Sequence, residues 1–170
     1  MRWICVLLLL ASCSKRPPVP TVNWLGQPGV LEEFTNRNNY PVALGEPVVR
    51  GRVLVLDMDN KCIAGWEYRL PRELFPASKE EVGTLVWLRR FRTPVARYAS
   101  GATGYQETLE MTIVDNVAKQ AVYTNVFTGG MPEKKVSETA AEAGEAARNG
   151  RSGGSPDEAA KRHLLSLPRK

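Results

Sequence analysis

The amino-acid sequence predicts a mainly β fold, a single antiparallel β-sandwich or open barrel of about six strands. Two observations support this class. Between residues 48 and 128, short segments rich in valine, leucine and aromatic residues are separated by turn residues. In the most regular segment, apolar residues alternate with polar ones. An irregular N-terminal arm (residues 23–46) is expected before the strands, and a partly helical or disordered C-terminal tail after them. The pattern does not choose between sandwich and barrel.

The first predicted strand, Val48–Met58, is apolar on both faces, because valine and leucine fill both sets of alternating positions. That pattern is typical of a central strand covered on both sides. Asp59-Asn60-Lys61 supplies turn residues, and Cys62–Arg69 is expected to return as the second strand of a hairpin. Cys62 is expected to be a small buried residue of that strand.

The middle of the chain predicts two further strands. Ser78 and Glu81 have the spacing of a capping box, which predicts a short helical turn. Thr84–Phe91 is the third strand, and Pro94–Ala99 is a weak edge strand because proline cannot donate to a sheet. Ser100–Gly104 is expected to be a flexible loop.

The clearest predicted hairpin joins Tyr105–Val114 to Gln120–Thr128 through a turn that begins at Asp115-Asn116. Apolar and polar residues alternate in the first of these strands, so one face should be buried and the other wetted. Residues 129–132, which include two glycines and a proline, should end the β-rich domain.

The tail holds two possible helix starts, at Thr139 with Glu142 and at Ser155-Pro156-Asp157-Glu158. After the second start, apolar residues recur at helical spacing: Ala160, Leu164 and Leu167. This helix could dock on a partner, fold back on its own domain, or belong to a disordered tail. Isolated helices of this length are marginal in water, which favours the last two alternatives.

The N-terminal residues have the pattern of an export signal. Arg2 precedes the apolar run Trp3–Leu10, whose eight residues are too few to span a bilayer, which takes about 20. The string Leu10-Ala11-Ser12-Cys13 resembles the lipobox of bacterial lipoproteins. The resemblance implies cleavage between Ser12 and Cys13 and attachment of a diacylglyceryl group, with acyl chains such as palmitate, to the Cys13 sulfur.

This resemblance divides the chain into a signal peptide (1–12), a lipid anchor with a proline-rich tether (13–22), a β-rich domain (23–132) and a tail rich in alanine, glycine and charged residues (133–170). It places the protein outside the cytosol, anchored to the cell envelope. In lipoproteins an aspartate after the cysteine favours inner-membrane retention. Ser14 therefore favours the outer membrane, on its periplasmic side, in a cell with two membranes.

Composition argues against several functions. Loss of residues 1–12 removes Arg2 and lowers the formal net charge from +5 to +4, which gives no reason to expect a nucleic-acid partner. Cys5 leaves with the signal and Cys13 carries lipid, so no intrachain disulfide of Cys62 is expected.

No catalytic residue, metal site or cofactor is predicted. Gly150–Gly154 matches the G-x-S-x-G pattern of serine hydrolases, and Asp157 and His163 follow it. A nucleophile elbow, however, needs a buried strand before the serine, and this segment has the composition of a linker. Asp57 and Asp59 form an incomplete calcium-loop pattern, which a β-turn explains better.

One candidate surface remains. Aromatic and guanidinium groups, which stack and bind anions, are interleaved in a short segment: Trp87, Arg89, Arg90, Arg92 and Arg97. These residues could bind a protein partner or an anion. Alternatively, the arginines only discourage edge-to-edge pairing of strands.

We therefore expect a lipid-anchored, non-catalytic envelope protein that binds or scaffolds a partner at the membrane surface. The membrane itself is contacted through lipidated Cys13, and the partner would be an envelope protein or an anionic glycan or lipid. The alternative is an envelope enzyme, or a binder of a glycan or small ligand, with a carboxylate- or arginine-lined site.

Overall fold

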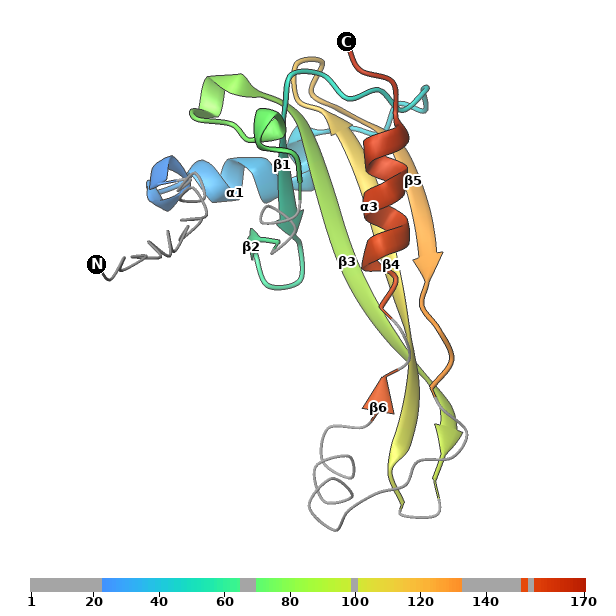
Figure 1. The fold of residues 1–170 in the computed structure, drawn as a ribbon. Helices are drawn as coiled ribbons and strands as arrows, with labels where there is room; N and C mark the ends of the chain where they lie inside the picture. Colours follow the sequence, from blue (N-terminus) through green and yellow to red (C-terminus); the bar gives the residue numbers. More distant parts are fainter. Residues whose placement is uncertain (1–22, 65–69, 99–100, 133–150, 153–154) are drawn as a thin grey trace, which may run out of the picture.

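The computed structural model describes residues 23–64, 70–98, 101–132, 151–152 and 155–170. Ser12, Cys13, the predicted helix start at Thr139 and most of the second predicted strand lie outside these residues. Within them, six strands form one open sheet in the order β2-β1-β3-β4-β5, with β6 pairing with β4 (Figure 1). The expected mainly β class, with an irregular arm and a partly helical tail, is confirmed.

The strands are β1 (Arg52–Asp57), β2 (Cys62–Ile63), β3 (Val82–Arg97), β4 (Thr103–Asp115), β5 (Gln120–Thr128) and β6 (Arg151–Ser152). The α-helices are α1 (Val30–Thr35) and α3 (Asp157–Ser166), and short 3-10 turns occur at Asn23–Gly26, Arg37–Asn39, Arg72–Leu74 and Lys79–Glu81. None of the described helices is long and apolar enough to span a bilayer. Figure 1 shows the long β3–β4 hairpin, with α3 lying against one face of the sheet and running roughly along β4 and β5.

The central strand β1 is covered on both faces, as its apolar pattern predicts. Its four middle residues, Val53 to Leu56, are each at most 1% exposed. Val53 and Val55 belong to a core shared with α3, whereas Leu54 and Leu56 belong to a second core shared with the N-terminal arm. The second layer on each face is therefore a helix or an irregular arm.

One pairing differs from the antiparallel arrangement that the sequence predicts, because β1 and β3 are parallel. β3 enters the sheet at the end where β1 began, with Val82 beside Arg52. Parallel neighbours require a crossover connection, and side-chain alternation, which predicted the strands, does not report their direction. Cys62 in β2 is exposed, not buried as expected, because it lies at the outer end of the sheet beside the turn.

The start of β3 packs closely against the residues that precede β1. The hydroxyl of buried Thr84 donates to the Arg50 carbonyl at 2.9 Å and accepts the Arg50 N–H at 2.7 Å. A Cβ on Gly83 would lie 2.3 Å from the Arg50 carbonyl oxygen, so this position requires glycine.

β3 continues through Pro94 as one strand, where the sequence predicts two shorter ones. Its pairing with β1 ends at Leu88, so at Pro94 the described sheet has β4 on one side of β3 only. A residue without an N–H is tolerated at such an edge. The predicted loop Ser100–Gly104 is also shorter than expected, since β4 begins at Thr103.

The predicted capping box does not form. The Glu81 carboxylate accepts the N–H of Ala77 at 2.7 Å, one residue before the Ser78 N–H that the motif specifies. The Ser78 side chain makes no cap hydrogen bond, so a 3-10 turn forms at Lys79–Glu81 in place of a regular helix.

α3 folds back on its own sheet, which is one of the alternatives that the sequence left open. Ala160 and Leu164 are buried against the core residues of β1, β3 and β4. The imidazole of His163 lies between two β5 rings, 5.7 Å from Tyr123 and 5.6 Å from Phe127, measured between centroids. The helix therefore completes the first core.

Removing the main apolar anchor of α3 should destabilise the protein. We expect Leu164→Ala to lower the free energy of unfolding by about 2–5 kcal/mol, the range for truncation of a buried leucine. Urea unfolding monitored by circular dichroism measures this change. Arg162→Ala, on the exposed side of α3, is the matched control and should stay within about 0.5 kcal/mol of the parent. Equal values for both variants would contradict the packing of α3.

A candidate binding pocket under the N-terminal arm

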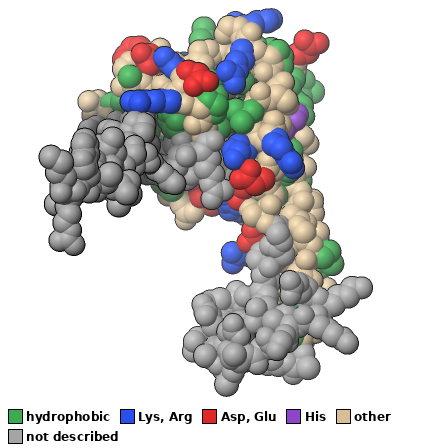
Figure 2. All heavy atoms as spheres, in the orientation of Figure 1, with side chains coloured by type: hydrophobic (Ala, Val, Ile, Leu, Met, Phe, Trp, Pro, Cys, Tyr) green, Lys and Arg blue, Asp and Glu red, His purple; other side chains and the backbone are tan. Residues whose placement is uncertain are grey.

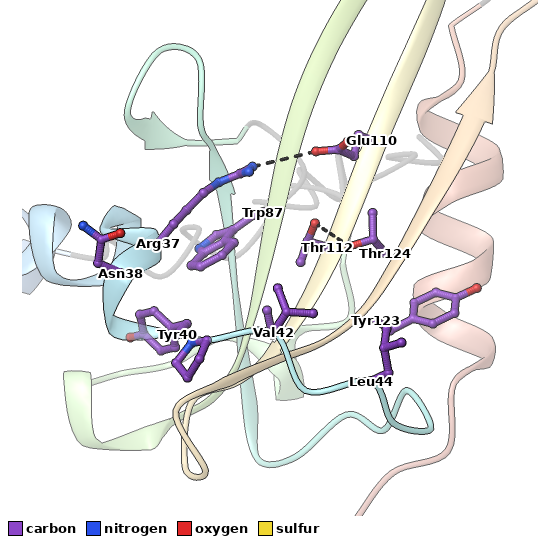
Figure 3. A pocket seen from close by; sticks show the side chains of 12 residues that line it. Arg37, Asn38, Tyr40, Val42, Leu44, Trp87, Glu110, Thr112, Tyr123 and Thr124 are labelled. Atoms are coloured by element: carbon purple, nitrogen blue, oxygen red, sulfur yellow. Dashed lines mark hydrogen bonds and ion pairs between the residues drawn. The ribbon is translucent and has the colours of Figure 1, made fainter.

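A pocket of about 600 Å³ lies on the sheet face opposite α3, between the N-terminal arm and strands β3 to β5 (Figure 3). We call it the arm pocket. The arm lines it with Arg37, Asn38, Tyr40, Pro41, Val42 and Leu44, and the strands line it with Trp87, Glu110, Thr112, Ala121, Tyr123 and Thr124. Figure 3 shows that the Tyr123 side chain points away from the pocket, toward α3.

The arm is held in place by hydrogen bonds to the sheet edge. The Ala43 N–H donates to the Ala121 carbonyl at 2.9 Å, and the Ala121 N–H donates to the Pro41 carbonyl at 3.0 Å. The Tyr40 hydroxyl donates to the Asn116 side-chain oxygen at 2.9 Å. The arm therefore acts as a short extra strand beside β5 and forms one wall of the pocket.

Trp87 joins the floor of the pocket to the core. Its indole N–H donates to the Phe34 carbonyl at 2.9 Å, and its ring meets that of Tyr40 edge-on, with centroids 5.4 Å apart. The Arg37 guanidinium lies 5.7 Å from the centre of the same ring, a cation–π contact. Trp87 is only 3% exposed, so its ring has almost no contact with solvent. Its role in the pocket is to position Arg37.

The polar groups of the pocket are an ion pair and a hydroxyl pair. Arg37 Nη2 lies 3.7 Å from Glu110 Oε1, and the two side chains are 48% and 27% exposed. A pair this long and exposed stabilises the fold little, so both groups keep hydrogen-bonding capacity for a ligand. The hydroxyls of Thr112 and Thr124 lie 3.0 Å apart on the sheet beside them.

The apolar part of the pocket is unusually accessible. Val42 is 78% exposed and Leu44 is 91% exposed, although both belong to the arm segment that pairs with β5. Exposed apolar side chains that border a pocket are typical of binding sites. The arm pocket thus places an apolar rim, formed by Val42 and Leu44, beside the Arg37–Glu110 ion pair, whose net charge is zero.

The predicted arginine surface is divided between the two faces of the sheet, because successive side chains of β3 alternate. Arg89 shares the face of Trp87, where it lies over the Phe91 ring at 5.2 Å and 3.7 Å from Asp59. Arg90 and Arg92 face the α3 side. Arg97 lies at the exposed far end of β3.

The arginines on the α3 side are paired. Arg90 donates to both carboxylate oxygens of Asp157, at 2.6 and 3.2 Å, and this bond raises the pKa of the guanidinium. Arg92 lies 3.1 Å from Glu107. Figure 2, which views this face, shows acidic and basic side chains interspersed, not gathered into one basic patch. Arg90 therefore holds the start of α3 against the sheet.

The catalytic-looking residues of the tail are engaged in packing. Asp157 binds Arg90, and the His163 ring is stacked between aromatic side chains of β5. Among the described residues no three His, Cys, Asp or Glu side chains come together as a metal site. Asp57 Oδ1 accepts the N–H groups of Asp59 and Asn60, both at 3.0 Å, so the predicted β-turn is confirmed at that position.

Arg37, Tyr40 and Glu110 were not among the residues singled out from the sequence. They come from segments far apart in the chain, and the arm has no regular period that would orient its side chains. The available signal was the aromatic Tyr40 in a polar, irregular segment, which is expected to pack on the domain.

Burial of Tyr40 gives a testable pH dependence. Burial, and secondly the nearby Glu33 carboxylate, raise the pKa of Tyr40 from 10.0 to about 12. The unfolded chain loses this proton at lower pH than the folded one, so the stabilisation is present below pH 10 and is lost as pH rises toward about 12. Titration by absorbance at the phenolate band should show a component near pH 12 that Tyr40→Phe removes and Tyr105→Phe retains. Its persistence in Tyr40→Phe would show that another tyrosine is responsible.

Comparison with known proteins does not identify this chain: no protein-family model matches it, and no curated protein matches it.

Proposed function

We propose that this chain is a lipid-anchored protein of the cell envelope, held to a membrane through Cys13, whose domain binds a partner at the arm pocket and catalyses no reaction. The Leu10-Ala11-Ser12-Cys13 string supports the anchor. If the organism has two membranes, Ser14 supports a position on the periplasmic side of the outer one.

The observation that carries the binding role is the exposed rim of the arm pocket. Val42 and Leu44 leave most of their apolar surface in water, and covering that surface would be favourable by about 25 cal/mol per Å². Beside the rim, Arg37 and Glu110 can bind polar groups of a partner with little net charge to overcome. A partner with apolar and neutral polar groups fits this combination.

The pocket chemistry supports binding more than catalysis. Active sites usually hold a base or nucleophile whose pKa is tuned toward neutrality. In the arm pocket the pKa of Tyr40 moves in the opposite direction, and its hydroxyl is engaged with Asn116. His163 belongs to α3, on the other face of the sheet, and its ring stacks on Tyr123 of β5.

The anchor predicts a change in location. Cys13→Ala in the full-length chain should abolish incorporation of labelled palmitate and move the protein from the membrane fraction to the soluble fraction. Two or more acyl chains hold a protein to a bilayer far more strongly than any contact of the domain, so the shift should be nearly complete. Cys62→Ala is the control and should stay with the membrane. Tight membrane association of Cys13→Ala would overturn the anchor.

A glycan is the second candidate partner, because the neighbouring guanidinium and carboxylate of Arg37 and Glu110 can bind adjacent sugar hydroxyls. On an array of envelope glycans, binding should then fall at least tenfold in Glu110→Gln and persist in Val117→Ser, whose side chain is exposed in the β4–β5 turn. A chain that binds no glycan but crosslinks to a protein through a photoreactive residue at Leu44 would favour the protein partner.

A further inference from the structure

The outer edge of β5 is only partly paired. β5 ends the described sheet, and only its first part has a neighbour on the outer side, where the arm bonds to Ala121 and Val122. The Gly129 N–H donates inward to the Glu107 carbonyl at 2.7 Å. Because hydrogen-bonding directions alternate along a strand, Thr124, Val126 and Thr128 point their backbone groups outward.

Within the described chain, those outward groups meet no other strand. Among the described residues, these groups make one local hydrogen bond: the Val126 N–H donates to the side-chain oxygen of Asn125 at 2.9 Å. Natural proteins usually protect such edges with charged side chains or proline. β5 has neither, whereas β1, β3 and β4 each carry charged residues.

The sequence of this edge is symmetric about Val126. The three outward positions read Thr124, Val126 and Thr128, and all three side chains are exposed. An antiparallel copy centred on Val126 would place valine opposite valine and each threonine opposite the other threonine. Threonine pairs of this kind stabilise sheets, and Thr112 with Thr124 already forms one inside this molecule.

We propose that β5 pairs antiparallel with β5 of a second copy of this chain, across a twofold axis at Val126, and joins the two sheets into one. About six backbone hydrogen bonds would form, two for each outward residue. The Gly129-Gly130 pair allows the chain to leave the edge before it meets the arm of the other copy. No like charges face each other, which is the condition that a self-pairing strand must meet.

The pairing rests on the proposed anchor for its strength. Five residues from each copy bury less area than a stable dimer in free solution needs. Tethering both copies to one membrane raises their effective concentration and favours the weak contact.

Crosslinking in intact cells tests the pairing. In full-length Cys62→Ser protein, Val126→Cys with a short bismaleimide should give a product of twice the protein mass, because the axis places the two thiols side by side. Val117→Cys in the β4–β5 turn, where Val117 is 74% exposed against 55% for Val126, is the matched control and should give at least tenfold less. Equal products from both variants, no product from Val126→Cys, or a product of another mass would overturn the proposal.

A charge exchange supplies an independent test. Val126→Lys or Val126→Glu expressed alone should reduce co-purification of two differently tagged copies at least tenfold, and co-expression of the two variants should restore it. Only a surface in which position 126 faces itself predicts that rescue. Failure of both tests with membrane-bound protein would leave the anchor intact and remove the pairing. Loss of membrane binding would instead be read from the Cys13→Ala experiment.

Discussion

The structure depends on one constraint: its central strands are apolar on both faces. Val53 and Val55 point to one side of β1 while Leu54 and Leu56 point to the other, and all four are buried. A single sheet with two apolar faces requires a cover on each of them. α3 covers one face and the N-terminal arm covers the other, so two segments with weak patterns of their own become ordered parts of the fold.

The arm pocket follows from the incomplete fit of one of these covers. Phe34 and Tyr40 fill the space over Leu85 and Trp87, but beyond Tyr40 the arm moves to the sheet edge to pair with Ala121. The floor between the arm and β4 is left to polar residues, Glu110 and Thr112. The same geometry that closes the core therefore leaves an accessible apolar rim next to a polar floor.

Much of the fold could be predicted from the sequence, because strand alternation and turn residues are local signals. β5 has the bounds that were predicted, and the two-sided burial of β1 follows from its valines and leucines. The direction of β1 relative to β3 could not be predicted, since it depends on a crossover that has no regular pattern. The arm pocket could not be predicted either, because the contact between Arg37 and Glu110 joins segments that are far apart in the sequence. The row of arginines was visible, but alternation sends Arg89 and Arg90 to opposite faces.

Backbone hydrogen bonds at Val49 couple the covers on the two faces of the sheet. Val49 donates its N–H to the Pro168 carbonyl at 2.9 Å and accepts the Lys170 N–H at 3.0 Å, so the segment that follows α3 is joined to the stretch between the arm and β1. Release of the helix would break these bonds to the stretch that joins the arm to β1, and loosening of that stretch would free the segment after the helix. Opposite sides of the sheet should therefore open together as one cooperative unit, and a ligand that steadies either side would protect the backbone amides of both.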